Sequence, residues 1–441
     1  MARRQSIGLR DRLTTFLPGA LVRDVARETG FVKRARKIDP VAFVWTLVLG
    51  FSCGTERTIA GLRRAFELAS GCAVVPSTFY DRFNEALVRC LRALVGIAIE
   101  RLAVSSRDLG GALAGFKDLV VTDSTVIRLS ELLAKRFPGC RTNHTKAALK
   151  LHVVMGAGHR SVKITSEREN DGKTFQVGKW VKGCLLLFDL GYFRYQLFDC
   201  IRRNLGWFVS RLKKNANPKI VAVHRKWRGR SVPVVGERLQ DVIARLQREV
   251  LDVEIEVDFR RRLYGGKRSG ATTTFRLVGI KDDATGEYHL YVTNLPVADF
   301  PAETVARIYR ARWSVELLFK SLKSDFALED MPSANPAVVE ALVYASVLTW
   351  LVSQELLRAV RRKLALGARR VTERRWTRLL GGLALLILRI VIGAPRAVAD
   401  SVRLVESALL HEARDPHVNR PSLIEIVENG GLQRHAAALA G

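Results

Sequence analysis

The sequence predicts an α/β protein in which a mixed β-sheet flanked by helices is joined to helical regions at both ends of the chain. Short apolar runs separated by polar or glycine-bearing turns, typical of strands, occur between residues 117 and 213. Apolar and polar residues then alternate between 214 and 296, which favours further strands. Apolar residues recur at helical spacing before and after these segments, and 441 residues allow two or three domains.

Helices are expected first, over residues 1–112, with Pro76 marking one helix start. Three strands, a helix, a strand, a helix and a strand follow, an order that suits a mixed sheet with helices on its faces. The strands are expected at 119–121, 149–155, 162–165, 185–188 and 207–210, and the helices at 173–180 and 195–203.

Residues 214–296 are predicted to form a β-rich insertion. Its strands are expected at 219–223, 253–257, 272–278 and 288–292, and one helix at 239–246. A helix is then predicted over 303–324, followed by a helical tail with breaks at Gly367, Gly381-Gly382 and Pro395. We therefore divide the chain into residues 1–112, 113–335 with the insertion, and 336–441.

The charge balance points to a polyanionic partner. The chain has 72 Lys and Arg against 43 Asp and Glu, a formal net charge of +29. Such a balance is far from that of a typical metabolic enzyme and favours nucleic acid as the partner. A basic surface that serves solubility alone is the other interpretation of the charge.

Cysteine usage and hydropathy indicate the compartment. The 6 cysteines contain no close pair, so the sequence favours buried, free thiols in a reducing compartment over a disulfide framework or a zinc site. The longest apolar stretches, 341–352 and 383–388, are shorter than the roughly 18 residues of a membrane span. The protein is therefore expected in the cytoplasm, with no membrane partner.

Two apolar runs lead into an aspartate. Asp123 follows the first predicted strand, and Asp189 follows the fourth. Acids at strand ends can share a cleft, and their hard oxygens suit Mg²⁺ or Mn²⁺ in two-metal phosphodiester chemistry. Each aspartate alone is better explained as a turn residue, because Asp often begins turns.

A third group of polar residues lies in the helix predicted over 303–324. At about 100° per residue, Tyr309, Arg312, Glu316 and Lys323 fall in one narrow sector of that helix, beside an apolar stripe. A carboxylate with two cations and a phenol suits a site that binds metal and phosphate oxygens. A solvated face of ion pairs explains Arg312 and Glu316 but not the tyrosine.

This spacing resembles the YREK signature of the IS-four family of bacterial insertion-sequence transposases. Together with Asp123-Ser124-Thr125 and Asp189-Leu190-Gly191-Tyr192, the resemblance spans about residues 115–330. It implies a ribonuclease-H-like catalytic domain in which Asp123, Asp189 and Glu316 hold two divalent ions, Mg²⁺ or Mn²⁺. It also implies that Tyr309, Arg312 and Lys323 bind phosphates of transposon-end DNA.

The implied activity is cut-and-paste DNA transposition. Family members nick the element end, cut the opposite strand through a hairpin and join the freed end to target DNA. The implied partners are double-stranded DNA, as terminal inverted repeats and target, and a second copy of the chain. Residues 1–112 are then the candidate end-binding region, and residues 336–441 a candidate region for dimerisation or DNA contact.

Three further DNA contacts are predicted from position. Arg211 and Lys213 follow a strand, where they can meet phosphate or remain solvated. Trp227 lies between two basic residues and can stack on a displaced base, although a packing role is also open.

Two other functions use the same residues. A transposase relic would bind DNA without cutting it, although three intact acids argue against that reading. A ribonuclease-H-like nuclease would cut without joining strands, and the acids themselves do not exclude it. The predicted insertion and the Tyr309 to Lys323 pattern favour transposition over both.

Overall fold

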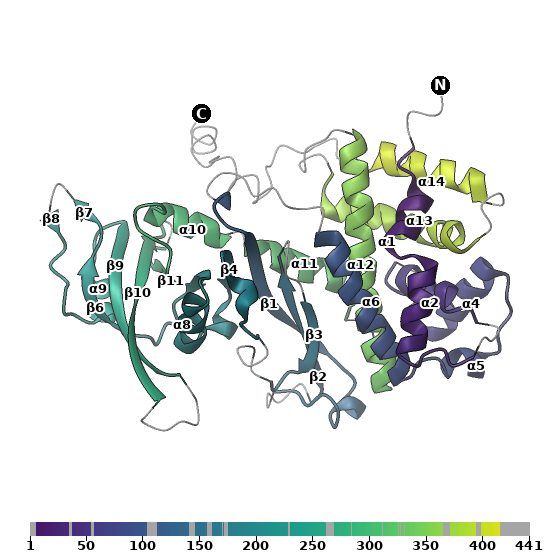
Figure 1. Ribbon diagram of the computed structural model, residues 1–441, viewed down its shortest axis with the longest axis horizontal. Helices are drawn as coiled ribbons and strands as arrows, with labels where there is room; N and C mark the ends of the chain where they lie inside the picture. Colours follow the sequence, from purple (N-terminus) through teal and green to yellow (C-terminus); the bar gives the residue numbers. More distant parts are fainter. Residues whose placement is uncertain are drawn as a thin grey trace.

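The computed structural model contains one part built around a β-sheet and another built of helices (Figure 1). The residues that the structure describes are 6–34, 38–53, 57–103, 113–140, 146–156, 161–169, 171, 175–227, 230–261, 269–283, 285–310, 312–324, 326, 328–329, 331–364, 371–393 and 398–414.

A mixed, nine-stranded sheet forms the first part, which confirms the predicted α/β class with helical regions. Its strands, in spatial order, are β3 (Ser161–Ser166), β2 (Ala148–Met155), β1 (Asp118–Arg128), β4 (Cys184–Phe188), β5 (Trp207–Arg211), β11 (Tyr288–Thr293), β10 (Gly270–Lys281), β9 (Val250–Arg260) and β6 (Lys219–Val223). β1, β4 and β5 are parallel neighbours, and the other neighbouring pairs are antiparallel. β7 (Lys226–Trp227) and β8 (Arg230–Ser231) pair with each other.

The strands predicted as an insertion continue this sheet. β11 pairs with β5, and β10, β9 and β6 follow outward from it. Two side chains reinforce the junction: Thr293 Oγ1 donates to the Phe208 carbonyl at 2.6 Å, and the Asn294 side chain accepts from the Phe208 N–H at 2.8 Å. The segment after residue 288 is thereby fixed beside β5, about 80 residues away in sequence.

Alternate residues of the central strands face two different apolar cores. Val121 and Leu187 belong to one core, and Val120 and Leu186 to the other. α10 (Ala302–Arg310) and α11 (Trp313–Ser324) pack on the first face, while α8 (Tyr195–Arg203) and α9 (Leu239–Arg245) pack on the second. The sheet is therefore buried on both faces, as parallel strands usually are.

The single helix predicted over 303–324 is wrong. α10 ends at Arg310 and α11 begins at Trp313, and the Arg312 N–H donates to the Tyr309 carbonyl at 3.0 Å in the turn between them. No glycine or proline marks this turn in the sequence. The ion pair of Arg312 with Asp123, which is distant in sequence, stabilises the turn instead. The helix predicted at 173–180 is also absent from its described residues, where only the short 3₁₀ turn η5 (Lys179–Val181) forms.

Helices from both ends of the chain form the second part. From the N-terminal side come α1 (Leu9–Phe16), α2 (Gly19–Glu28), α3 (Pro40–Thr46), η2 (Leu47–Phe51), α4 (Ile59–Ser70), α5 (Pro76–Tyr80) and α6 (Glu85–Ala103). From the C-terminal side come α12 (Pro336–Leu364), α13 (Glu373–Ile392) and α14 (Ala399–Glu412). The two sets share one core and are not separate bundles.

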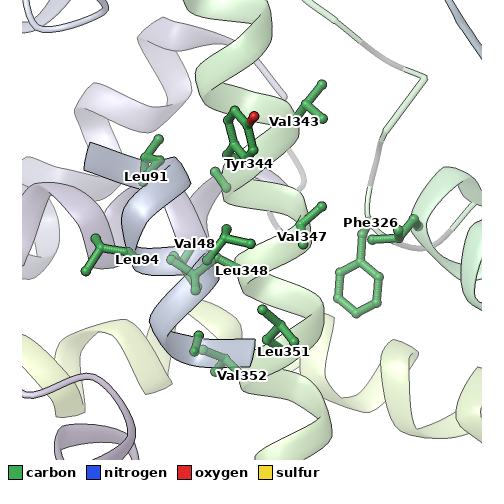
Figure 2. Close-up of a cluster of buried hydrophobic side chains, with 14 of the residues drawn as sticks. Val48, Leu91, Leu94, Phe326, Val343, Tyr344, Val347, Leu348, Leu351 and Val352 are labelled. Atoms are coloured by element: carbon green, nitrogen blue, oxygen red, sulfur yellow. The ribbon is translucent and has the colours of Figure 1, made fainter. Parts of the chain in front are cut away.

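α12 lies at the centre of these helices. Figure 2 shows Leu91 and Leu94 of α6 and Val48 of η2 on one side of α12, and Phe326, which follows α11, on the other. All four side chains are almost fully buried. α12 therefore connects the helical part to the helix that covers the sheet.

α12 is longer than the apolar stretch expected there. Among the described residues it is the one helix long and apolar enough to span a membrane, but 89% of its apolar window is buried inside the protein. That burial is what a core helix requires. The 6 cysteines are free thiols, although Cys140 is exposed and only Cys90 and Cys184 are buried.

Candidate active site

The parallel pairing of β1 with β4 brings two aspartates together. The last paired residues are Thr122 and Phe188, so Asp123 and Asp189 are the next residues on the two strands. Val121 and Leu187, two residues earlier, face α10 and α11. Because side chains alternate along extended backbone, both carboxylates point toward that same face.

Asp123 is not at the end of its strand, contrary to the sequence-based expectation. β1 continues to Arg128 because β2 pairs with it from Val121 onward. β4 ends at Phe188, and Asp189 begins the 3₁₀ turn η6 (Leu190–Tyr192). The two acids therefore meet where β4 stops and β1 passes beside it.

Arg312 joins the two aspartates to Glu316. Its Nη1 lies 3.3 Å from Asp123 Oδ2 and 3.9 Å from Asp189 Oδ1, and its Nη2 donates to Glu316 Oε1 at 2.5 Å. The turn between α10 and α11 carries Arg312, and the first turn of α11 carries Glu316. All three predicted acids thus surround one guanidinium.

The three acids differ in burial. The Asp123 side chain is 13% exposed, against 38% for Asp189 and 34% for Glu316. Burial raises the pKa of the Asp123 carboxyl to about 7, and the Asp189 and Glu316 charges act in the same direction. The Ser124 N–H, which donates to Asp123 at 2.7 Å, and the Arg312 charge oppose this rise in pKa. The site is therefore closed behind Asp123 and open at the other two acids.

Tyr309 and Lys323 hold the two helices on the sheet. The buried Tyr309 hydroxyl donates to the Phe188 carbonyl at 3.2 Å, next to Asp189. Lys323 Nζ donates to the Val126 carbonyl at 2.9 Å and pairs with Glu329 at 2.8 Å. Tyr309 lies on α10 and Lys323 on α11, so the two residues do not share one continuous helix. Arg312 still lies 5.5 Å from the centre of the Tyr309 ring and pairs with Glu316.

The three further predicted DNA contacts lie at different places. Arg211 Nη2 lies 3.0 Å from His289 Nδ1, and the Arg211 charge lowers the pKa of Tyr309, which burial raises to about 12. Lys213 Nζ lies 5.7 Å from the centre of the Phe193 ring, just past η6. The backbone of Trp227 forms β7, but its side chain is outside the described residues.

A buried polar cluster behind the acids was missed by sequence reasoning. His152 lies 3.2 Å from the Tyr192 hydroxyl and 2.8 Å from that of Thr165, and Asp171 pairs with Lys150 at 3.1 Å. Burial lowers the pKa of His152 to about 4, so its ring is neutral near pH 7. The alternation of Lys150 and His152 with apolar residues in β2 is the sequence signal for this second face.

The donor set suits a hard divalent cation. Among the described residues, no group of three or more His, Cys, Asp and Glu side chains is placed to hold a metal ion. The carboxylates of Asp123, Asp189 and Glu316 nevertheless converge on a cation, the Arg312 guanidinium. Three carboxylates around one positive charge are the ligand chemistry that Mg²⁺ and Mn²⁺ prefer.

A sheet with acids on adjacent central strands, in a chain of net charge +29, is the arrangement expected of an enzyme that acts on nucleic acid. The family model described as "Transposase DDE domain" matches residues 114–352, so the chain belongs to this family. It is a DNA transposase of the bacterial insertion-sequence type, an enzyme that cleaves DNA and transfers strands. The DDE domain implies a requirement for divalent metal.

The relatives are insertion-sequence transposases. The chain is 21% identical to the transposase of element IS231F from Bacillus thuringiensis subsp. israelensis, over 77% of each protein. It is 22% identical to the IS231B transposase of Bacillus thuringiensis subsp. berliner over 80% of each. A probable IS5377 transposase of Geobacillus stearothermophilus is 26% identical over 63% of this chain and 67% of the relative.

One solved structure shows a weaker likeness. It is described as a "piggyBac transposase synaptic complex with hairpin DNA" and aligns with a TM-score of 0.43 and 10% identity, over 91% of this chain and 86% of that chain. At this TM-score the likeness defines no residue correspondences.

Proposed function

We propose that Asp123, Asp189 and Glu316 are the catalytic residues of this transposase and hold two divalent metal ions, Mg²⁺ or Mn²⁺. The observation that carries the proposal is the Arg312 guanidinium, which lies 2.5–3.9 Å from a carboxylate oxygen of each acid. One cation in contact with all three acids supports a shared cation-binding role. Among the described residues, no other pair of acids comes directly after the last paired residues of two adjacent parallel strands.

A bound metal pair supplies a nucleophile at neutral pH and stabilises charge on the leaving oxygen. The protein contributes the closed wall at Asp123 and the open side at Asp189 and Glu316, where DNA approaches. Arg312 then exchanges the acids for a DNA phosphate, a partner that a guanidinium binds strongly. Arg312 thereby balances the acids without DNA and grips the substrate with it.

The other DNA contacts are proposed around this site. Lys323, whose side chain is 29% exposed, binds phosphate beside Arg312. Tyr309, whose buried hydroxyl donates to the carbonyl next to Asp189, contributes to the same DNA-binding site by fixing that carbonyl. Arg211, the last residue of β5, and Lys213, which follows β5, bind further phosphates. Trp227 stacks on a base displaced near the cleavage site.

We also assign the fold and regions. The parallel strands β1, β4 and β5 beside the antiparallel β2 and β3 support a ribonuclease-H-like core. Residues 113–335 form this catalytic region, with 214–296 as its β-rich extension. Residues 1–112 bind the transposon end, and residues 336–441 serve dimerisation or DNA contact. The substrates are terminal inverted repeats and target DNA, the enzyme works as a homodimer on DNA, and it acts in the bacterial cytoplasm.

Substitution of each acid by its amide tests the catalytic assignment. Asp123→Asn, Asp189→Asn and Glu316→Gln keep the side-chain shape but weaken metal ligation. Each is expected to lower end cleavage by at least about a thousandfold while DNA binding persists. The assay incubates the protein with Mg²⁺ and DNA carrying the element's own inverted repeats, and detects cut ends and joined products.

The matched control is Glu131→Gln, an exposed acid in the same region that pairs with Lys146 at 2.8 Å. It should cut at the normal rate. Normal cleavage by any of the three acid variants would remove that residue from the triad. Cleavage without joining by the unmodified protein would instead favour the nuclease, and binding without cleavage the relic.

A further inference from the structure

Three arginines surround a buried carboxylate that lies midway along α8. The Asp199 side chain is 0% exposed. Arg202 Nη2 and Arg203 Nε lie 3.1 and 3.0 Å from its oxygens, and Arg261 Nε, which follows β9, lies 3.4 Å away. Arg202, Arg203 and Arg261 are called the arginine cluster below.

The arginine cluster has more positive charge than Asp199 balances. Three guanidinium groups around one carboxylate leave a formal surplus of two positive charges. Within the described part of the chain, no second acid forms an ion pair with Arg203 or Arg261. A surplus held together against its own repulsion indicates an anionic partner at this place.

The cluster is both ordered and accessible. Arg202 donates to Thr273 Oγ1 at 2.6 Å and lies 5.7 Å from the centre of the Phe275 ring. The three side chains are nevertheless 43%, 54% and 51% exposed, in the order Arg202, Arg203, Arg261. Guanidinium groups that are already held in place lose little conformational freedom when they bind phosphate.

We infer that the arginine cluster binds the phosphate backbone of DNA at a point separate from the three acids. α8 packs on the second face of the sheet, whereas Asp123 and Asp189 point toward the first face, so the cluster lies apart from the acids. The inference rests on DNA as the partner of a transposase and is independent of the catalytic roles proposed above.

The test measures DNA binding against salt concentration. The variant Arg203→Gln/Arg261→Gln keeps Arg202 as the partner of Asp199. Glutamine at the two other positions removes the positive charge and leaves a polar amide. The probe is a short fluorescein-labelled duplex of unrelated sequence, read by anisotropy without metal. Each lost phosphate contact lowers the slope of log K against log salt by about 0.9, so the expected fall is about 1–2. The affinity for the duplex at about 0.1 M salt should fall roughly tenfold or more.

The matched control is Arg225→Gln/Arg245→Gln. These arginines are 42% and 60% exposed and each pairs with a single acid, Glu303 or Glu237. The control removes the same formal charge, so it is expected to leave the slope nearly unchanged. An equal slope change in both double variants overturns the inference. So does a change in oligomeric state with an unchanged slope.

A second measurement needs no folded variant. Phenylglyoxal modification of the unmodified protein, read by mass spectrometry, should show DNA protecting Arg203 and Arg261 more than Arg225 and Arg245. Equal protection of the two pairs contradicts the inference. The amide variants of the three acids should keep the full salt slope, so failure of the catalytic assignment is distinguishable from failure of this one.

Discussion

At the scale of single residues, the negative charges of three acids hold the Arg312 side chain in place. Three carboxylates surround its guanidinium, and the Arg312 side chain is 11% exposed. Without that positive charge the acids repel one another, because like charges this close in a partly buried site interact strongly. On the proposed assignment of these acids as metal ligands, a metal ion and Arg312 would compete for them.

Arg312→Gln is expected to lower the free energy of unfolding by about 1–3 kcal/mol, a buried-pair effect reduced by the exposure of Asp189 and Glu316. Mg²⁺ should then raise the melting temperature of the variant more than that of the unmodified protein, since no guanidinium has to be displaced. Thermal melting without DNA, with and without Mg²⁺, measures both effects. Equal Mg²⁺ shifts would refute the competition, and Arg245→Gln, at an exposed pair, is the control.

The sequence points to the acids as candidates but does not show that they lie close together. Asp123 and Asp189 follow apolar runs, and this local pattern is visible without a structure. The register that makes them neighbours depends on β1 pairing with β4, a contact about 65 residues apart in sequence. The place of Arg312 among three acids depends on a turn with no local signal. The positions of the acids in the chain could therefore be read from the sequence, whereas their arrangement around Arg312 could not.

At the scale of elements, η6 connects the two faces of the sheet. Asp189 begins this turn on the side of α10 and α11, and Tyr192 ends it against His152 on the opposite side. Gly191 lies between them, where an added Cβ would be 2.5 Å from Asp171 Oδ2. The tight packing of Gly191 against Asp171 therefore helps to set the position of Asp189.

Gly191→Ala is expected to destabilise the protein by about 1–3 kcal/mol through overpacking, and to reduce cleavage more than DNA binding. Urea unfolding and the cleavage assay measure the two effects. Gly96→Ala is the control, because Gly96 lies inside α6 with open space around it. Alanine there should stabilise by about 0.5–1 kcal/mol. Similar stability changes at both glycines would contradict the packing argument.

Strands were easier to predict than helix ends. The five strands expected between 119 and 210 correspond to β1 to β5, and those expected in the insertion correspond to β6, β9, β10 and β11. Their apolar runs are local signals. The break between α10 and α11 has no such local signal. The break predicted at Gly381-Gly382 is absent, because α13 runs through both glycines and tertiary packing overrides the weak preference of single residues.

At the scale of the whole molecule, α12 is the helix on which the N-terminal and C-terminal helices pack. α6 and η2 bury Leu91, Leu94 and Val48 against it (Figure 2). Glu340 on α12 is 3% exposed and pairs with Arg136, after β1, at 2.9 Å and with Arg92, on α6, at 3.9 Å. The sheet, the N-terminal helices and the C-terminal helices therefore meet at one helix.

Residues 1–112 alone are consequently expected not to fold. Burial of each large apolar side chain contributes about 1.5–3 kcal/mol, so loss of several is comparable with a domain's total stability of about 5–15 kcal/mol. The fragment should show no cooperative thermal transition by circular dichroism, and fusion to residues 336–414 should restore one. The same fusion with Leu348→Asp, a change at a fully buried position of α12, should not. A cooperative transition in the isolated fragment would mean that the N-terminal helices have a core of their own.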